Sequence, residues 1–435
     1  MNAKSRAIFR CSAIAVSLLA MSSPLRVAGQ APAAAPAPLA THVTLEQAID
    51  LALKHNHSLQ AARTMISQNQ AQEITANLRP NPVGLIDEQY LPFFSPKAFT
   101  HDYVDTNAVF DLGFSYLIER GRKRHWRYEA ARDQTAVTTA TVTDDERALT
   151  ANVAQQFISA LLAKANIDLA EQDLKSFQQT VDISQASFKA GAMSEGDLIK
   201  IKLQLLQFQM DLSAAKLAQV QALATLRQLI GFDAVPENYE VDGDLNYENM
   251  HLNLDDLKMV ALRSRPDLRA AVLGVKASQS QFSLAKANGK QDLGVTFTYN
   301  HLGGVNTGSL FFNMQIPIFD RNQGEIARTR YAVTQSQELS SEQASIALTD
   351  VVNAYESLRT SDEVVSLYQS GYLKQAEESR DISQYAYQRG AASLLDFLDA
   401  ERSYRSTELA YRQALAGYMS SLEQLRQAVG TRSLQ

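Results

Sequence analysis

The sequence predicts an internally duplicated α+β membrane protein in which long helical hairpins are joined to four β-strands. Three observations lead to this fold class. Local motifs recur in the same order at a nearly constant offset, one helical stretch between Gly121 and Gly191 contains no proline, and short segments alternate apolar with polar side chains. A helix of that length would extend on the order of 100 Å, which does not fit an ordinary compact domain. Strands with one apolar face are typical of a lipid-facing barrel.

The first 29 residues have the features of a signal peptide. Basic residues precede a short apolar run over 11–21, and small side chains at 27–29 offer a cleavage site. The lone cysteine, Cys11, lies at the start of that run and not after the cleavage site, so we expect export without lipidation. Residues 30–43 are rich in Ala and Pro and predict a flexible lead-in.

Composition and charge exclude several classes of function. Of the 435 residues, 45% are hydrophobic and 20% are charged, as in a folded chain. Loss of residues 1–29 removes four basic and no acidic residues, which changes the formal net charge from −6 to −10. Nucleic acid is therefore a poor partner. The histidines lack the spacing of zinc ligands, and no catalytic motif is present, so we expect no metal site, no cofactor and no enzyme activity.

The chain contains two copies of one unit. The tripeptides at 183–185 and 226–228 recur at 382–384 and 425–427, in both cases 199 positions later. That period is too long for a solenoid and indicates duplication of a whole subdomain. The expected organisation is a first repeat over 44–231, a linker over 232–253, a second repeat over 254–430 and a tail over 431–435.

Each copy has the same predicted order of elements: a helix, two strands, a very long helix, a turn and a return helix. In the first copy the expected ranges are 44–78 for the opening helix, 82–92 and 107–118 for the strands, 122–189 for the long helix and 194–230 for the return helix. In the second copy they are 254–287, 291–301 and 308–319, 324–388 and 393–429. The first return helix has apolar side chains at the 3/4 spacing of a coiled-coil seam. These are Leu198, Ile201, Leu205, Phe208, Leu212, Ala215, Ala222, Leu226 and Leu229.

The strands determine whether this is a soluble coiled coil or a membrane protein. Three segments alternate clearly, as where Phe110, Leu112 and Phe114 are separated by small or polar residues, whereas 82–90 alternates poorly. A soluble sheet with one buried face has the same period, so alternation alone leaves both alternatives open. Segment lengths of about ten residues and aromatic residues near the strand ends favour lipid. Four strands cannot close a barrel, so we expect several copies to complete one; three would supply twelve strands.

These features together resemble the TolC-like outer-membrane efflux proteins over essentially the whole mature chain. Residues 317–324, Pro-Ile-Phe-Asp-Arg-Asn-Gln-Gly, are similar to the strand-to-helix passage of the heavy-metal Czc/Cus-type and related branches, and residues 119–124 resemble its counterpart in the first copy. The resemblance implies a homotrimer, with one β-barrel in the outer membrane and a long α-helical coiled-coil barrel that forms a periplasmic tunnel.

The same resemblance implies a function and partners. The trimer would be a passive exit duct in a tripartite efflux system. It would dock on a periplasmic adaptor (membrane fusion) protein and, through it, on an inner-membrane pump of the resistance-nodulation-division type, and its barrel would contact outer-membrane lipid. Two alternatives stay open: a type I secretion exit duct of the same fold, and a soluble periplasmic coiled-coil scaffold. The sequence does not specify the exported substrate.

The resemblance also suggests a periplasmic gate. Asp396 and Asp399 match the family's aspartates at the tunnel tip, where rings of carboxylates in a trimer would favour cations. Asp396 also fits a capping box at the start of the return helix, which requires no gate. Asp197 and Tyr387 match positions that hold the tip closed, although Ala392 replaces the arginine that often completes this network.

Two further sets of residues are candidates. The turns at the hairpin tips would meet the adaptor, although a glycine there is also an ordinary helix C-cap. The tip residues are Gly191, Ala192, Gly390 and Ala391. A basic cluster after the second strand would contact anionic lipid at the membrane interface, and a solvated helix start explains it equally well. The interface residues are Arg122, Lys123, Arg124 and Trp126.

Overall fold

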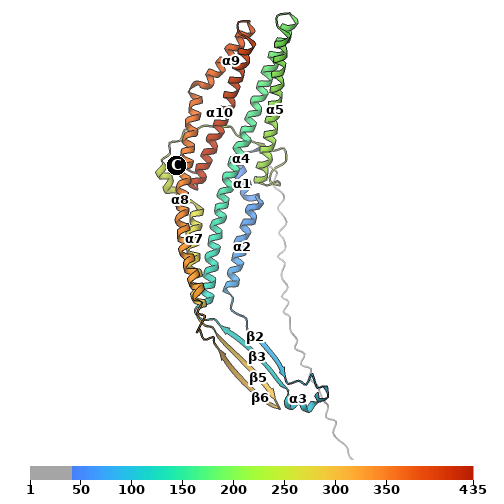
Figure 1. The fold of residues 1–435 in the computed structure, drawn as a ribbon, viewed down its shortest axis with the longest axis vertical. Coiled ribbons are helices and arrows are strands. Elements are labelled where there is room, and N and C mark those ends of the chain that lie inside the picture. Colours follow the sequence, from blue (N-terminus) through green and yellow to red (C-terminus); the bar gives the residue numbers. More distant parts are fainter. Residues whose placement is uncertain (1–41, 435) are drawn as a thin grey trace, which may run out of the picture. The chain divides into compact units, whose positions relative to one another are not determined.

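The computed structural model describes residues 42–434, which form long helices and one four-stranded sheet (Figure 1). The expected signal peptide and most of the lead-in lie outside the described residues. Within residues 42–434, none of the helices is both long and apolar enough to cross a membrane.

The first repeat follows the predicted order of elements, except that two short helices that were not predicted lie between its strands. It consists of α1 (Leu45–His55), α2 (His57–Asn77), β2 (Val83–Gln89), η1 (Pro96–Ala98), α3 (His101–Asn107), β3 (Val109–Ile118), α4 (Lys123–Lys189) and α5 (Glu195–Ile230). The single opening helix expected over 44–78 is wrong, because Asn56 divides it into α1 and α2. The Asn56 side chain accepts a hydrogen bond from the backbone N–H of Leu59 at 3.0 Å and so caps α2.

As a duplicated unit predicts, the second repeat has the same order of long helices and strands, but within the described residues no short helices lie between its strands. It consists of α6 (Leu254–Ser264), α7 (Pro266–Asn288), β5 (Leu293–Leu302), β6 (Val305–Asn313), α8 (Gln323–Leu367), η2 (Tyr368–Tyr372), α9 (Leu373–Gln388) and α10 (Leu394–Val429). Between the repeats, β4 (Glu240–Val241) pairs in parallel with β1 (His42–Val43).

Three expected elements of the second repeat differ from the structure. The opening helix breaks at Arg265, because Pro266 disfavours helical backbone in the residue before it. The long helix expected over 324–388 is interrupted at Gly371, whose φ of 130° is incompatible with a continuous helix. Strand β6 ends at Asn313 and not at residue 319, because its partner β5 begins at Leu293 and pairs no residue beyond Asn313.

Over β3 and β5 the sheet has one apolar and one polar face, as the alternation predicted, whereas β2 does not alternate and places Glu88 opposite Phe110. The antiparallel order of the sheet is β2-β3-β5-β6, which leaves β2 and β6 as free edges. Phe114 lies opposite Phe297, which lies opposite Leu310, and all three side chains are exposed in the single chain. On the other face, the Asn300 amide donates a hydrogen bond to Asp111 at 2.5 Å. The exposed apolar face and the hydrogen-bonded polar face match a lipid-facing strand pattern.

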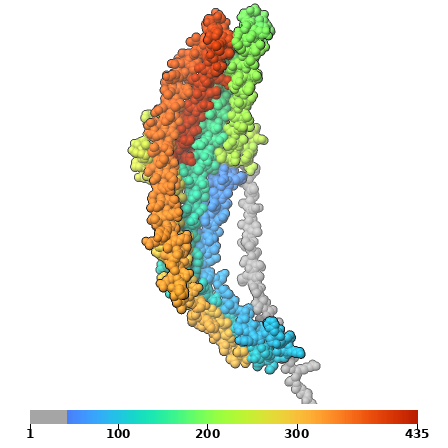
Figure 2. Space-filling view, viewed as in Figure 1, coloured from blue at the N-terminus to red at the C-terminus, as the bar shows by residue number. Residues whose placement is uncertain are grey.

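The helices pack as two hairpins with coiled-coil seams. On α5 the expected seam is buried against α4, with Ile201, Phe208 and Leu226 at most 1% exposed. Toward the turns the two hairpins also contact each other, because Phe397 of α10 stacks on Phe177 of α4 with ring centroids 6.4 Å apart. Figure 2 shows the α5 surface in green against the α10 surface in red. The helical part of the predicted fold class is therefore confirmed.

Candidate functional site

The two hairpin turns have the same capped geometry. Gly191 and Gly390 have φ values of 76° and 73°, a left-handed conformation that glycine adopts without steric cost. The N–H of Ala192 donates to the carbonyl of Ser187 at 2.9 Å, and the N–H of Ala391 donates to the equivalent carbonyl in its own hairpin at 2.8 Å. These bonds are those of a Schellman motif, which satisfies carbonyls at the end of a helix. The turns are exposed and preformed.

A groove of about 670 Å³ lies between the two turns. Asp197 and Tyr387, from different repeats, both line it, but among the described residues no hydrogen bond joins them. The Asp197 carboxylate instead accepts a hydrogen bond from Ser194 at 2.8 Å and pairs with Lys200 at 3.2 Å. These contacts, the Ser194 hydrogen bond first, hold the pKa of Asp197 below its ordinary value of 3.8.

Tyr387 is held by stacking. Its ring lies 5.4 Å from that of Phe397, and the two planes differ by 7°. The buried hydroxyl has no hydrogen-bond partner among the described residues. Burial raises the pKa of Tyr387, so the phenol is neutral at physiological pH.

Asp396 and Asp399 are both exposed on one face of α10. The carboxylate of Asp396 accepts hydrogen bonds from the Ser393 hydroxyl at 2.7 Å and from the Ser393 backbone N–H at 3.1 Å. The Asp396 N–H donates back to the Ser393 hydroxyl, which completes the expected capping box. These bonds lower the pKa of Asp396. Asp399 has a looser partner, Arg402, at 3.2 Å, and both side chains are mostly exposed.

An ion-pair network that sequence reasoning missed lies farther along α10. Arg405 pairs with Asp211 of α5 and Asp173 of α4, and thus connects the two repeats. Burial raises the pKa of Asp173 despite the nearby positive charge of Arg405, and burial also raises the pKa of Glu401 on α10. The only sequence signal for this network is the presence of charged residues on predicted helices. Because its members are far apart in the sequence, that signal does not show which of them pair.

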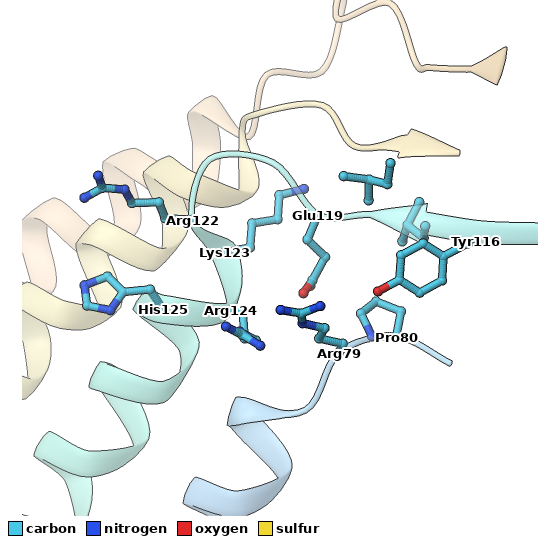
Figure 3. Close-up of a pocket in the computed structure, with 10 residues that line it drawn as sticks. Arg79, Pro80, Tyr116, Glu119, Arg122, Lys123, Arg124 and His125 are labelled. Atoms are coloured by element: carbon cyan, nitrogen blue, oxygen red, sulfur yellow. The ribbon is translucent and has the colours of Figure 1, made fainter. Parts of the chain in front are cut away.

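The expected interface residues lie where the sheet meets the helices, around a pocket of about 380 Å³ (Figure 3). Arg122, Lys123 and Arg124 line it, whereas Trp126 does not. Lys123 forms an ion pair with Asp292 at 2.8 Å. Sequence reasoning missed Arg79, which lines the same pocket from the segment between α2 and β2. Among residues 42–434, no group of three His, Cys, Asp or Glu side chains is arranged to hold a metal ion.

Comparison with known proteins places the chain in a family. The outer membrane efflux protein profile matches residues 89–232 and 259–431. The cobalt-zinc-cadmium resistance protein CzcC of Cupriavidus metallidurans is 25% identical over 381 residues, which cover 85% of each chain. The pyoverdine export outer membrane protein OpmQ of Pseudomonas putida is 24% identical over 403 residues, covering 87% of this chain and 84% of the relative.

Solved structures show the same fold. A membrane protein from Pseudomonas aeruginosa matches with a TM-score of 0.75 at 19% identity, covering 89% of this chain and 92% of that one. The open-state MtrE outer membrane channel of Neisseria gonorrhoeae matches with a TM-score of 0.73 at 20% identity, covering 90% of each chain. Since the family profile covers more than half of its length, the chain belongs to the outer membrane efflux protein family.

Proposed function

We propose that this chain is the outer-membrane channel component of a tripartite efflux pump and acts as a passive homotrimeric exit duct. The observation that carries the proposal is the sheet, which exposes an apolar face and leaves the β2 and β6 edges unpaired. Each unpaired backbone group costs several kcal/mol in lipid. Pairing β6 of one copy with β2 of the next removes both edges. Three copies would give a closed barrel of twelve strands.

The helical hairpins support a periplasmic tunnel with external partners. The α4 helix has 67 residues, so at about 1.5 Å per residue it extends about 100 Å from the sheet. The exposed turns at Gly191–Ala192 and Gly390–Ala391 would meet a periplasmic adaptor, and through it an inner-membrane pump of the resistance-nodulation-division type. Export would begin with the signal peptide over residues 1–29, without lipidation.

The cargo would be selected by the pump. Some relatives are named for cobalt, zinc and cadmium resistance or for cation efflux, and another for pyoverdine export. Asp396 and Asp399 would form rings of carboxylates at the tunnel tip that favour cations over anions, and Asp197 and Tyr387 would help to hold the tip. These roles tune passage and require no catalysis by the duct.

The test is the assembly state of the full-length chain expressed in a Gram-negative host. We expect it to sediment with outer membranes, to need detergent for release, and to have the mass of three copies by native mass spectrometry. In planar bilayers it should conduct. A stable monomer, or release from the periplasm without detergent, would overturn the proposal in favour of a soluble scaffold.

A further inference from the structure

The pocket at the junction of sheet and helices is lined by three arginines that form no ion pair among the described residues. Of the basic residues lining it, Lys123 is paired with Asp292, and the only acid lining it, Glu119, is paired with Arg127 at 2.7 Å. Among the described residues, no carboxylate lies within 4.0 Å of the side-chain nitrogens of the remaining arginines. Those arginines are Arg79, Arg122 and Arg124. Unpaired cations are notable here because acids outnumber Lys and Arg by 47 to 41 in the chain.

Two separate segments bring these charges together. Arg79 follows α2, whereas Arg122 and Arg124 flank the first residue of α4. In Figure 3 the Arg79 and Arg124 side chains extend toward the same region beside Glu119, and Arg122 extends to the other side of the α4 start. A solvated helix start explains basic residues on α4 but gives no reason for an arginine from another segment to line the same cavity.

The pocket is continuous with the exposed apolar face of the sheet. Ile118, at the end of β3, lines the pocket and is 42% exposed, on the same face of the strand as Phe114. Leu117 also lines the pocket, but from the opposite face of the strand. Farther along β3, Phe114 and Leu112 continue the exposed apolar face. The strand has 10 residues, which is about the length that a tilted strand needs to cross the hydrocarbon core. The basic pocket thus begins where the hydrocarbon core would end.

Apolar surface followed by unpaired arginines matches the chemistry of a phospholipid. Arginine binds phosphate oxygens through two parallel N–H donors, and such charge-assisted hydrogen bonds are stronger than neutral ones. Free phosphate would use the arginines but would gain nothing from the apolar surface of Ile118 and the strand face that it continues. We propose that this pocket binds the phosphate of an anionic phospholipid on the periplasmic side of the membrane, with Arg79 and Arg124 as its ligands. This proposal rests on the membrane insertion of the sheet proposed above.

The chain contains a built-in probe for this site. Trp126 is the only tryptophan, and its ring lies 5.0 Å from that of His125, which lines the pocket. Brominated lipid bound in the pocket would therefore quench its fluorescence. The experiment measures Trp126 fluorescence while the detergent-solubilised full-length protein is titrated with brominated phosphatidylglycerol or with brominated phosphatidylcholine. A third titration adds inorganic phosphate to protein already quenched by brominated phosphatidylglycerol and measures whether the fluorescence recovers.

We expect phosphatidylglycerol to quench at about 10-fold lower concentration than phosphatidylcholine, and R79A/R124A to lose that preference. The control R263A/R269A removes the same charge from exposed positions on α6 and α7. This control should keep the preference for phosphatidylglycerol. Equal quenching by the two lipids, or an unchanged preference in R79A/R124A, would overturn the proposal. Displacement by millimolar phosphate alone would show a free-anion site and would also overturn it.

Native mass and conductance of the same preparations separate this inference from the proposed function. If the wild-type protein is not a conducting trimer, the proposed function fails. If it is a conducting trimer without lipid preference, only the pocket assignment fails. If R79A/R124A dissociates into monomers while its lipid preference persists, the arginines contact a second copy of the chain instead of a lipid.

Discussion

Arg405 on α10 forms an ion pair of 2.5 Å with Asp211 on α5, in the other repeat. The Arg405 Nε lies 3.3 Å from the Asp173 carboxylate on α4, and its guanidinium lies 4.7 Å from the ring centroid of Phe208. One side chain therefore joins the second hairpin to both helices of the first. The Arg405 side chain is only 16% exposed, so water screens these interactions weakly.

Replacing Arg405 with alanine should destabilise the contact between the hairpins. The change removes the ion-pair partner of the buried Asp173 carboxylate and leaves only the more distant charges of Arg380 and Arg412. Loss of one partner of a buried ion pair costs about 3–5 kcal/mol. We expect the lower end of that range, because Asp211 is 30% exposed. The measurement is the melting temperature of the detergent-solubilised protein by circular dichroism.

Arg402→Ala is the matched control for Arg405→Ala. Arg402 lies one turn earlier on α10, and its side chain is 71% exposed. Exposed pairs of this kind contribute about 0–1 kcal/mol. If the two variants melted at the same temperature, Arg405 would not have the connecting role assigned to it.

Periodic features could be predicted from the sequence because they repeat. The 3/4 spacing on α5 and the alternation on β3 each express a physical requirement, that one face be apolar, at many positions at once. Because the chain is internally duplicated, each of these patterns occurs in both repeats. The helix breaks were missed because each depends on one residue: Asn56 as a cap, Pro266 as a breaker and Gly371 at positive φ.

Contacts between the repeats could not be predicted because no local pattern encodes them. Arg405 and Asp173 are far apart in the sequence, and the spacing of apolar residues on their helices does not indicate that they meet. The pocket at the junction of sheet and helices could not be predicted for the same reason. Arg79 belongs to the segment between a predicted helix and a predicted strand, and no pattern there indicates that it lines a pocket with Arg124. The groove residues Asp197 and Tyr387 were located through family resemblance, and the structure places them close together without a direct bond.

Neutralising the two tip aspartates should weaken divalent cation block. In D396N/D399N the side chains keep their size, and the amide oxygen introduced at position 396 can still accept the capping hydrogen bond from Ser393. Because the carboxylate rings would attract cations, their loss should raise several-fold the concentration of divalent cation that blocks half of the current. Single-channel recording in planar bilayers measures this concentration.

Ser393→Ala separates capping from charge at the tip. It removes the hydroxyl that caps α10, at a cost of about 0.5–2 kcal/mol, but keeps both carboxylates. We expect a lower melting temperature and unchanged divalent block. If D396N/D399N were blocked like the wild type, the aspartates would serve only as helix caps and exposed charges.

The buried Asp133 on α4 should make stability depend on pH. Burial alone would raise the pKa of Asp133, but the hydrogen bond from Ser280 and the ammonium of Lys276, 2.9 Å away, together lower it below 3.8. An acid whose pKa is lowered on folding stabilises the fold above its unfolded pKa and loses that contribution as the pH falls through its folded pKa. Asp133→Asn should therefore melt earlier than the wild type at neutral pH, and the difference should shrink below about pH 4.

Asp256→Asn on α6 is the control for Asp133→Asn, since that acid forms no ion pair among the described residues. Its melting temperature should follow the wild type at both pH values. A difference for Asp133→Asn that stayed constant between neutral pH and pH 3 would show that the α4–α7 contact does not depend on the carboxylate charge.

Gly371 tests whether the break between α8 and α9 is required by the fold. Its φ of 130° and ψ of −12° lie in a region that costs a residue with a Cβ about 1–3 kcal/mol. The site has room, since a Cβ would meet nothing closer than the Gln375 amide at 4.0 Å. Any loss of stability in Gly371→Ala therefore reports backbone strain and not a clash.

Gly274, within α7 and in open space, is the control for Gly371. Gly274→Ala should stabilise the protein by about 0.5–1 kcal/mol through helix propensity alone. Opposite shifts in melting temperature would show that contacts along α9 hold the break in place, whereas stabilisation by both substitutions would show that α8 and α9 can merge into one straight helix.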